Sequence, residues 1–252
     1  MNGRRMRFLG AIGWWARIFG LLGISALRCA QGQIAVNVND VPSVNQAKVE
    51  FRYENAQLQP AKYTLVVDEA GAGRFHSEPG QTPPPDTPGY HPMPNSLDRT
   101  VQLSKGTTAQ IFATARGEKY FTIGCEDTRN KVAFQGTKQL SYRGSDGNGS
   151  CIYNWSKIVS IQKLTGVLES IAFTLEVGRR LEVEHQHDRL ALDSELGALA
   201  EAVKDGQASE IENIRPILQA IIEDQATMDR AKSRAQKLLD GAESNRAYLP
   251  PS

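Results

Sequence analysis

The sequence predicts an α+β protein with an N-terminal antiparallel β-sandwich or barrel-like region, followed by a C-terminal helical hairpin or bundle. Apolar and polar residues alternate between residues 34 and 155, which is the period of strands that have one buried face. After residue 155 the apolar residues recur at the spacing of a helix. The three cysteines include one in a predicted leader, and the remaining pair favours a disulfide.

The first thirty-two residues have the layout of a secretory signal peptide. Three arginines precede an apolar stretch from Phe8 to Leu27, which Arg17 interrupts. Small residues place the cleavage near Gly32. We therefore expect residues 1–32 to be removed, the protein to be secreted or periplasmic, and no stable membrane span to remain. The alternative is an uncleaved N-terminal anchor, in which Arg17 would cost about 2.5–3.5 kcal/mol near mid-span.

Removal of this leader changes the net charge. The leader holds five arginines and no acidic residue, so the mature chain has 24 basic and 28 acidic residues. A chain with more acidic than basic residues lacks the excess of lysine and arginine that binding to a phosphate backbone requires. We expect no nucleic-acid partner.

The cysteines agree with export. Cys29 leaves with the leader, and Cys125 and Cys151 are predicted to form one disulfide in an oxidising compartment. Closing a loop of this length stabilises a protein by about 2–4 kcal/mol. Two alternatives stay open. One is a pair of buried thiols in a cytosolic protein, and the other is a lipoprotein attached through Cys29, where Arg28 occupies the place of a small residue.

The β-rich domain is expected to span residues 33–155 and to contain roughly eight short strands. A proline-rich insertion at residues 79–94 lacks the donors for a ladder and is expected to be an exposed loop, or else a ligand for a partner's groove with Tyr90 as its anchor. The inward-facing residues of the strands are predicted to be Ile34, Val36, Val38, Val49, Phe51, Tyr53, Tyr63, Leu65, Val67, Val101, Leu103, Ile111, Ala113, Ala115, Phe121, Ile123, Cys125, Val132, Phe134, Cys151, Tyr153 and Trp155.

Residues 156–252 are predicted to be helical. A first helix extends from about Leu164 to His187, and a second begins at Asp193 and ends at Gly206. The third helix is expected to cover residues 209–241. It starts with a capping box formed by Ser209 and Glu212, and Pro216 kinks it.

The third helix carries a heptad seam that two polar residues, Gln225 and Lys232, make unsuitable for a stable coiled coil. We therefore expect the helices to pack on one another within the chain. The alternative is an exposed stripe that is used for self-association. The seam consists of Ile211, Ile214, Leu218, Ile221, Gln225, Met228, Lys232, Ala235 and Leu239.

The search for reactive groups gives no constellation that requires catalysis, a cofactor or a metal. His185 and His187 lie two apart on a predicted helix and point about 200° away from each other, so they cannot hold one ion. Asp146 and Asn148 resemble the start of a calcium loop, but the glycines around them favour a hairpin turn. A nucleophile elbow, a phosphate loop and a dinucleotide fingerprint are absent from the sequence. We predict no catalytic, cofactor-binding or metal-binding residue.

Several segments resemble an uncharacterised family of secreted bacterial proteins. The resemblance covers most of the mature chain and implies bacterial export and one continuous unit that is first β and then helical. No activity is assigned to such proteins, so it transfers no site residue. The segments are Tyr63–Pro79, Gly136–Tyr142, Gly149–Cys151, Tyr153–Trp155, Thr174–Glu182 and Asp188–Asp193.

These observations predict an exported, non-catalytic protein of the bacterial envelope or periplasm that acts as a binding or structural interaction module. Its partner is an unknown envelope protein or a second copy bound through the helical region. The alternative is a periplasmic hydrolase with a site at the junction of the β and helical regions, using His76 or His185.

Overall fold

The computed structural model describes residues 46–80 and 96–247. The predicted leader, the strand expected around residues 34–38 and nearly all of the proline-rich insertion lie outside these residues. The described elements belong to one compact unit, Ser43–Ser252.

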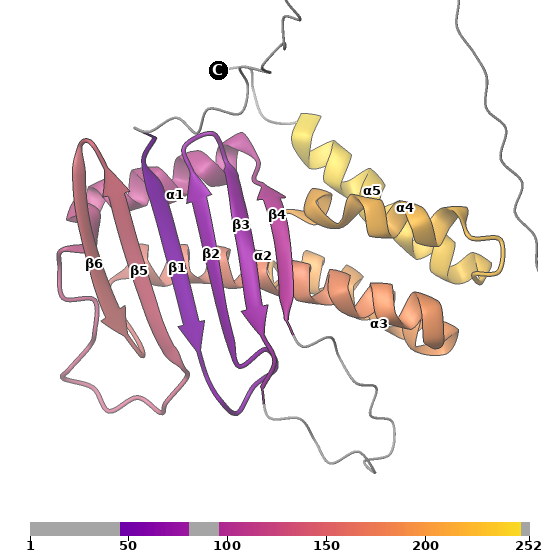
Figure 1. Cartoon of the computed structure of the whole chain (residues 1–252), viewed down its shortest axis with the longest axis horizontal. Helices are drawn as coiled ribbons and strands as arrows, with labels where there is room; N and C mark the ends of the chain where they lie inside the picture. The colour runs from indigo at the N-terminus through magenta and orange to yellow at the C-terminus, as the bar shows by residue number, and fades with distance from the viewer. Residues whose placement is uncertain (1–45, 81–95, 248–252) are drawn as a thin grey trace, which may run out of the picture. The chain divides into compact units, whose positions relative to one another are not determined.

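The centre of this unit is a six-stranded antiparallel sheet in the order β4-β3-β2-β1-β5-β6 (Figure 1). The first four strands form a meander that runs outward from β1 to the β4 edge, and the β5–β6 hairpin joins the other side of β1. The strands are β1 (Lys48–Glu54), β2 (Lys62–Asp68), β3 (Ala72–Glu78), β4 (Leu97–Gln102), β5 (Thr137–Gly144) and β6 (Gly147–Tyr153).

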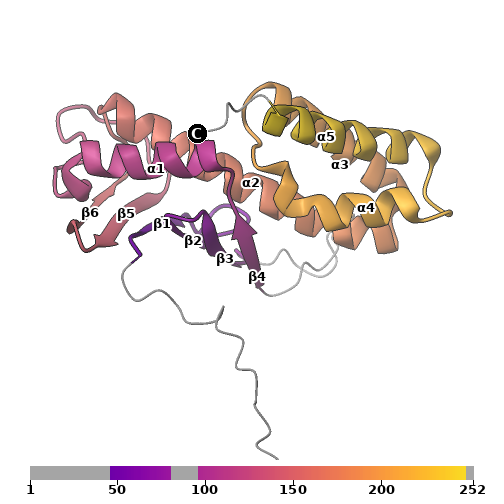
Figure 2. The same cartoon turned by 90° about the horizontal axis from the view of Figure 1, so that it is seen from above.

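The sheet is open, so the predicted barrel is wrong, and in the described residues no second sheet completes a sandwich. Helices α1 (Lys105–Gly117) and α2 (Val159–His187) cover one face instead (Figure 2). The opposite face carries charged residues such as Arg52, Arg74 and Asp98. Alternation correctly indicates that each strand has one buried face, but it does not indicate whether a helix or another sheet buries that face.

Helix α1 replaces a strand predicted around Ile111, Ala113 and Ala115. The residues that it buries are Thr108, Ile111, Phe112 and Ala115, which share one face at helical spacing. Its first turn is capped by Ser104, whose side chain accepts a hydrogen bond from the backbone N–H of Thr107. The short apolar alternation in the sequence was therefore a poor indicator of a strand, and Ser104 as an N-cap was the stronger signal, for a helix.

The strands predicted near Phe121 and Phe134 are also wrong, because a short 3₁₀ helix, η2 (Lys119–Phe121), and a loop occupy this part of the chain. Phe121 is nevertheless buried, whereas Phe134 is 64% exposed. A Cβ atom on Gly149 of β6 would lie 2.4 Å from the carbonyl oxygen of Tyr120, so this glycine permits η2 to pack closely on β6.

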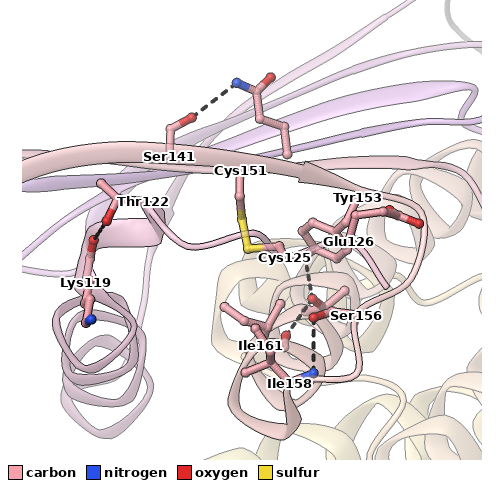
Figure 3. Close-up of a disulfide and its surroundings, with 12 residues drawn as sticks. Lys119, Thr122, Cys125, Glu126, Ser141, Cys151, Tyr153, Ser156, Ile158 and Ile161 are labelled. Atoms are coloured by element: carbon pink, nitrogen blue, oxygen red, sulfur yellow. Dashed lines mark hydrogen bonds between the residues drawn. A yellow bond between two sulfur atoms is a disulfide. The ribbon is translucent and has the colours of Figure 1, made fainter. Parts of the chain in front are cut away.

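Cys125 and Cys151 form a disulfide, as predicted, with a Cα–Cα distance of 5.8 Å. The bond attaches the loop after η2 to strand β6, and Figure 3 shows it beside Ile161 of α2 and Tyr153. Both cysteines are buried. The bond therefore fixes an irregular segment against the core, together with the 3.0 Å backbone hydrogen bond from Asp127 N–H to the oxygen of Trp155.

The helical region agrees with the prediction in its first two helices and differs in the third. Helix α2 ends at His187, as expected, and α3 (Arg189–Lys204) begins at the cap Asp188 rather than Asp193. The third predicted helix is divided into η3 (Ile211–Ile214), α4 (Arg215–Glu223) and α5 (Asp229–Ala247).

The division of the third helix has a local cause. Pro216 occupies the first turn of α4, where the missing N–H of proline costs nothing, and so it starts a helix rather than kinking one. Asp224 ends α4 and accepts hydrogen bonds from Ala226 and Thr227, which turns the chain before α5. The apolar seam residues are buried within the chain, and this confirms that the helices pack on one another: Ile211, Ile214, Leu218, Ile221, Ala235 and Leu239.

Two apolar cores lie along α2. The first is formed by the sheet, α1 and the first part of α2, up to Leu175. The second begins at Val177 and is formed by the rest of α2 with α3, η3, α4 and α5. Figure 2 shows α2 extending from the helix-covered face of the sheet into the helical group. The predicted boundary between residues 155 and 156 stays a prediction, and it falls just before this shared helix.

Polar contacts also join the two cores. The carboxylate of Glu210 accepts a 2.9 Å hydrogen bond from the backbone N–H of Ser104 and further bonds from the hydroxyls of Ser104 and Thr107. Asn213 accepts a 2.7 Å bond from the backbone N–H of Gln102 at the end of β4. The segment before α4 is thus attached to the sheet edge and to the start of α1.

Candidate functional site

A cavity of about 670 Å³ lies between the sheet and α2, and we call it the sheet–α2 cavity. Its volume falls in the range of pockets that hold small organic ligands, about 300–1,000 Å³. It is lined by Tyr53, Leu58, Gln59, Pro60, Tyr63, Gln135, Lys138, Tyr153, Asn154, Trp155, Ser156, Gln162, Thr165, Gly166, Glu169, Ala172, Phe173, Glu176 and Arg180.

The strand register builds the sheet side of this cavity. One row of paired residues crosses the whole sheet on its helix-covered face, and we call it the tyrosine–lysine row. Its central members line the cavity, and they come from four different strands. From β4 to β6, the row reads Leu97, Ser77, Tyr63, Tyr53, Lys138 and Tyr153.

The cavity lies over the end of the strands that α1 does not cover, since none of its lining residues belongs to α1. Both helices run across the strands (Figure 1). Helix α1 packs over the far ends, where Phe112 contacts Tyr142 at a ring distance of 6.1 Å. Helix α2 supplies the other wall, and Gly166 and Ala172 are small residues on that wall. Aromatic residues cover the floor, with Tyr53 stacked on Tyr63 at 5.1 Å.

Lys138 is the basic group of the sheet wall. Its side chain is only 7% exposed, and its Nζ donates a 3.2 Å hydrogen bond to the backbone oxygen of Asn154. The ammonium also lies 5.5 Å from the centre of the Tyr53 ring. Burial lowers the pKa of Lys138, because it penalises the charged form, and the charges of Glu169 and Glu126 oppose this effect.

Glu169 of α2 forms an ion pair with Lys138 on the wall of the cavity. Its Oε1 is 3.8 Å from Lys138 Nζ, too far for a direct hydrogen bond. Burial raises the pKa of the Glu169 carboxyl, and the nearby lysine opposes this effect. Burial likewise raises the pKa values of Tyr63 and Tyr153, so these hydroxyls stay protonated at neutral pH. Lys138 and Glu169 therefore offer a donor and an acceptor side by side, next to the tyrosine side chains, and the Glu169 side chain is 40% exposed.

The other charged residues of the cavity have partners at its margin. Glu176 accepts a hydrogen bond from the Ser77 hydroxyl and forms a 2.6 Å ion pair with Arg179, and both charged side chains are 5% exposed. Arg180 forms a 2.6 Å ion pair with Glu195 of α3. Lys138 and Glu169, by contrast, form an ion pair at 3.8 Å without a hydrogen bond between the two side chains.

The histidines considered in the sequence do not line this cavity. His76 lies on the other face of the sheet, with Nδ1 3.2 Å from Asp98. His185 is at the end of α2, with Nε2 3.0 Å from Asp224. His187 lies at the last position of α2, and His91 falls outside the described residues.

The suspected calcium loop is a hairpin turn. Asp146 lies in the turn between β5 and β6, where its carboxylate accepts hydrogen bonds from Tyr142 and Arg116, each shorter than 2.8 Å. Over residues 46–80 and 96–247, no three histidine, cysteine, aspartate or glutamate side chains converge as ligands of a metal ion would. Over the same ranges, none of the helices combines the length and the hydropathy that a membrane crossing requires.

The sequence reasoning missed Lys138 and Glu169. Strand β5 was not predicted, although Lys138, Leu140 and Tyr142 alternate with polar residues and are all buried. A lysine in phase with buried residues is the signal that could have found the site, because lysine is rarely buried without a partner. Glu169 had no such signal, since a glutamate on a long helix is ordinary.

The chain was compared with known proteins. No known protein family matches the chain, and no curated protein matches it. The function is therefore argued from the cavity itself.

The cluster around Glu184 predicts a pH dependence of stability. Burial raises the pKa of Glu184 to about 7. Repulsion from Glu195 and Asp188 adds to this effect, and the charge of Arg180 opposes it. The folded state therefore keeps a proton that the unfolded state loses at lower pH, and stability falls as the pH rises from about 4.5 to about 7. Glu184→Gln removes this loss, so it should stabilise the protein by about 1–2 kcal/mol at pH 8 and have little effect at pH 4.

Urea unfolding of the wild type and the variant at both pH values measures this difference. The control is Glu223→Gln, on the exposed surface of α4. If Glu184→Gln changed the free energy of unfolding equally at pH 4 and pH 8, the raised pKa assigned to Glu184 would be contradicted.

Proposed function

We propose that this chain is an exported binding protein that holds a small organic molecule in the sheet–α2 cavity. The observation that carries the proposal is the environment of Lys138. Its ammonium is nearly buried, donates to the backbone oxygen of Asn154, and forms a 3.8 Å ion pair with Glu169 on the wall of the cavity. A ligand that accepts from this ammonium would offset the cost of desolvating it.

A purely structural role explains Lys138 less well. A buried cation is costly, and a well-packed apolar residue at the same place is often neutral or stabilising by comparison. The neighbours of Lys138 in the tyrosine–lysine row, Tyr53 and Tyr153, would pack readily against an apolar side chain. A cavity of this size that combines aromatic walls with a charged pair offers both the apolar contacts and the polar groups that a ligand site needs.

The hydrolase alternative receives less support. It places the reaction at the junction of the β and helical regions, where the cavity lies, but relies on His76 or His185. Each of these histidines is paired with an aspartate elsewhere, at 3.2 Å and 3.0 Å. Binding without reaction therefore accounts for more of the observations.

Export is part of the same proposal. The buried disulfide between Cys125 and Cys151 supports folding in an oxidising compartment. We propose cleavage near Gly32 and a secreted or periplasmic location, with the uncleaved anchor as the alternative. The partner, if there is one, is an envelope protein or a second copy. Self-association would need a surface other than the apolar seam, which is buried within the chain.

Blocking the cavity tests the binding role. Gly166 of α2 lines the cavity, and a Cβ atom there would meet nothing within 4 Å. Gly166→Leu should fill part of the cavity and keep the fold, because leucine favours a helix by about 1 kcal/mol relative to glycine. Ligand-observed NMR with a library of neutral, anionic and cationic fragments should find compounds that bind the wild type and bind Gly166→Leu at least about tenfold more weakly.

Gly241→Leu is the matched control, since Gly241 is an exposed glycine of α5 whose Cβ would also meet nothing within 4 Å. This variant should bind the fragments like the wild type. A library without any binder, or binding that Gly166→Leu leaves unchanged, would refute the proposed function.

N-terminal sequencing of the native protein, purified from its source, tests export. We expect a first residue at or near Gln33, because a signal peptidase would cut after Gly32. An intact Met1 would show that the leader is retained and would favour the anchor.

A further inference from the structure

Building on the proposed function, we propose that the occupant of the sheet–α2 cavity is a neutral saccharide whose hydroxyls accept from Lys138 and donate to Glu169. The proposal follows from the charges, the hydrogen-bonding groups and the apolar surfaces of the cavity wall.

The charges of the wall favour a neutral ligand. A carboxylate or phosphate placed at Lys138 would also meet the carboxylate of Glu169, whose Oε1 lies 3.8 Å from Lys138 Nζ. A cation placed at Glu169 would meet the ammonium of Lys138 in the same way. Like charges at such distances in a partly desolvated site repel strongly. A ligand without net charge avoids both penalties.

The hydrogen-bonding groups favour hydroxyls. An ammonium only donates and a carboxylate only accepts, so a ligand that satisfies both needs an acceptor and a donor close together. A hydroxyl is both, and two hydroxyls on neighbouring carbons place these functions side by side. Hydrogen bonds of this kind are strengthened because one partner is charged. A sugar ring that lies over the 3.8 Å ion pair can therefore present one hydroxyl to Lys138 and a neighbouring hydroxyl to Glu169.

The remaining wall suits the same chemistry. The other polar side chains include four neutral amides, which both donate and accept. Gln59, Asn154 and Gln162 each already bond to the backbone, and the fourth amide is Gln135. Asn154 and Gln162 keep a second donor or acceptor position. Apolar surface comes from Trp155, Phe173 and Leu58, of which Phe173 is 39% and Leu58 is 50% exposed. Pyranose rings have polar edges and C–H faces, and the C–H faces pack on aromatic and aliphatic side chains. The cavity thus presents both kinds of surface that a saccharide needs.

The test uses matched saccharides that differ in charge. Binding to the full mature chain is measured by isothermal titration calorimetry and NMR with neutral hexoses, N-acetylhexosamines and their disaccharides, together with glucuronate and glucosamine. We expect at least one neutral saccharide to bind, and its charged counterparts to bind at least about tenfold more weakly, because each brings a like charge to the pair.

Two variants identify the groups that make the contacts. Lys138→Met keeps the length of the side chain and removes the donor. This variant should bind the neutral saccharide about tenfold or more weakly than the wild type. Glu169→Gln removes the charge of the acceptor and should also lower the affinity for the neutral saccharide, by several-fold. Lys163→Met is the control, since Lys163 is an exposed residue on the same helix. Thermal unfolding confirms that each variant is folded.

The outcomes separate this inference from the proposed function. If glucuronate binds more tightly than glucose and Glu169→Gln strengthens the binding of glucuronate, the cavity is an anion site and the inference is wrong. If glucosamine binds best and Lys138→Met strengthens the binding of glucosamine, the cavity is a cation site and the inference is again wrong. If no saccharide binds while other fragments bind in a manner that Gly166→Leu abolishes, the inference fails and the proposed function stands. If nothing binds, both fail.

Discussion

The sharing of α2 between two apolar cores is the constraint on which the rest of the structure depends. Its first part, up to Leu175, packs beneath the sheet, and its second part, from Val177, packs among α3, α4 and α5. Between them lies the buried pair of Glu176 and Arg179, held at 2.6 Å. A buried pair is weak evidence for stability, but loss of one partner is costly because it leaves an unpaired charge. The two cores are therefore coupled through one helix at a point where the chain tolerates little change.

The same helix makes the cavity. Because α2 crosses the sheet with its wall residues at helical spacing, it places Glu169 next to Lys138, while the register of three strands places Lys138 between Tyr53 and Tyr153. The charged pair therefore belongs to regular elements, which hold side chains more rigidly than loops do. Glu176 contributes to both features, since it lines the cavity and also anchors α2 to Ser77 of β3. The wall of the cavity and the coupling of the cores thus share a residue.

Several features of the fold could be predicted from sequence because their signals are local. Alternation identified the buried faces of β1 and β2, helical spacing identified α2, and the even cysteine count identified the pair Cys125–Cys151. Prediction was wrong where short apolar patterns were ambiguous, as in α1, where a capped helix replaces a strand. It also could not show that helices, rather than a second sheet, cover the buried face. The cavity escaped prediction because Lys138 and Glu169 are 31 positions apart in the sequence, and only the strand register and the path of α2 bring them together.

Native-state hydrogen exchange along α2 tests the shared-helix account most directly. If α2 couples the two cores, backbone amides near Leu168 and near Leu181 should exchange with the same free energy of opening. Arg179→Met should lower both by an equal amount, about 3–5 kcal/mol, because it leaves Glu176 buried without its cation. Opening of the second part of α2 together with α3, α4 and α5, at a lower free energy than the sheet, would contradict the account. It would show that the helical group unfolds by itself.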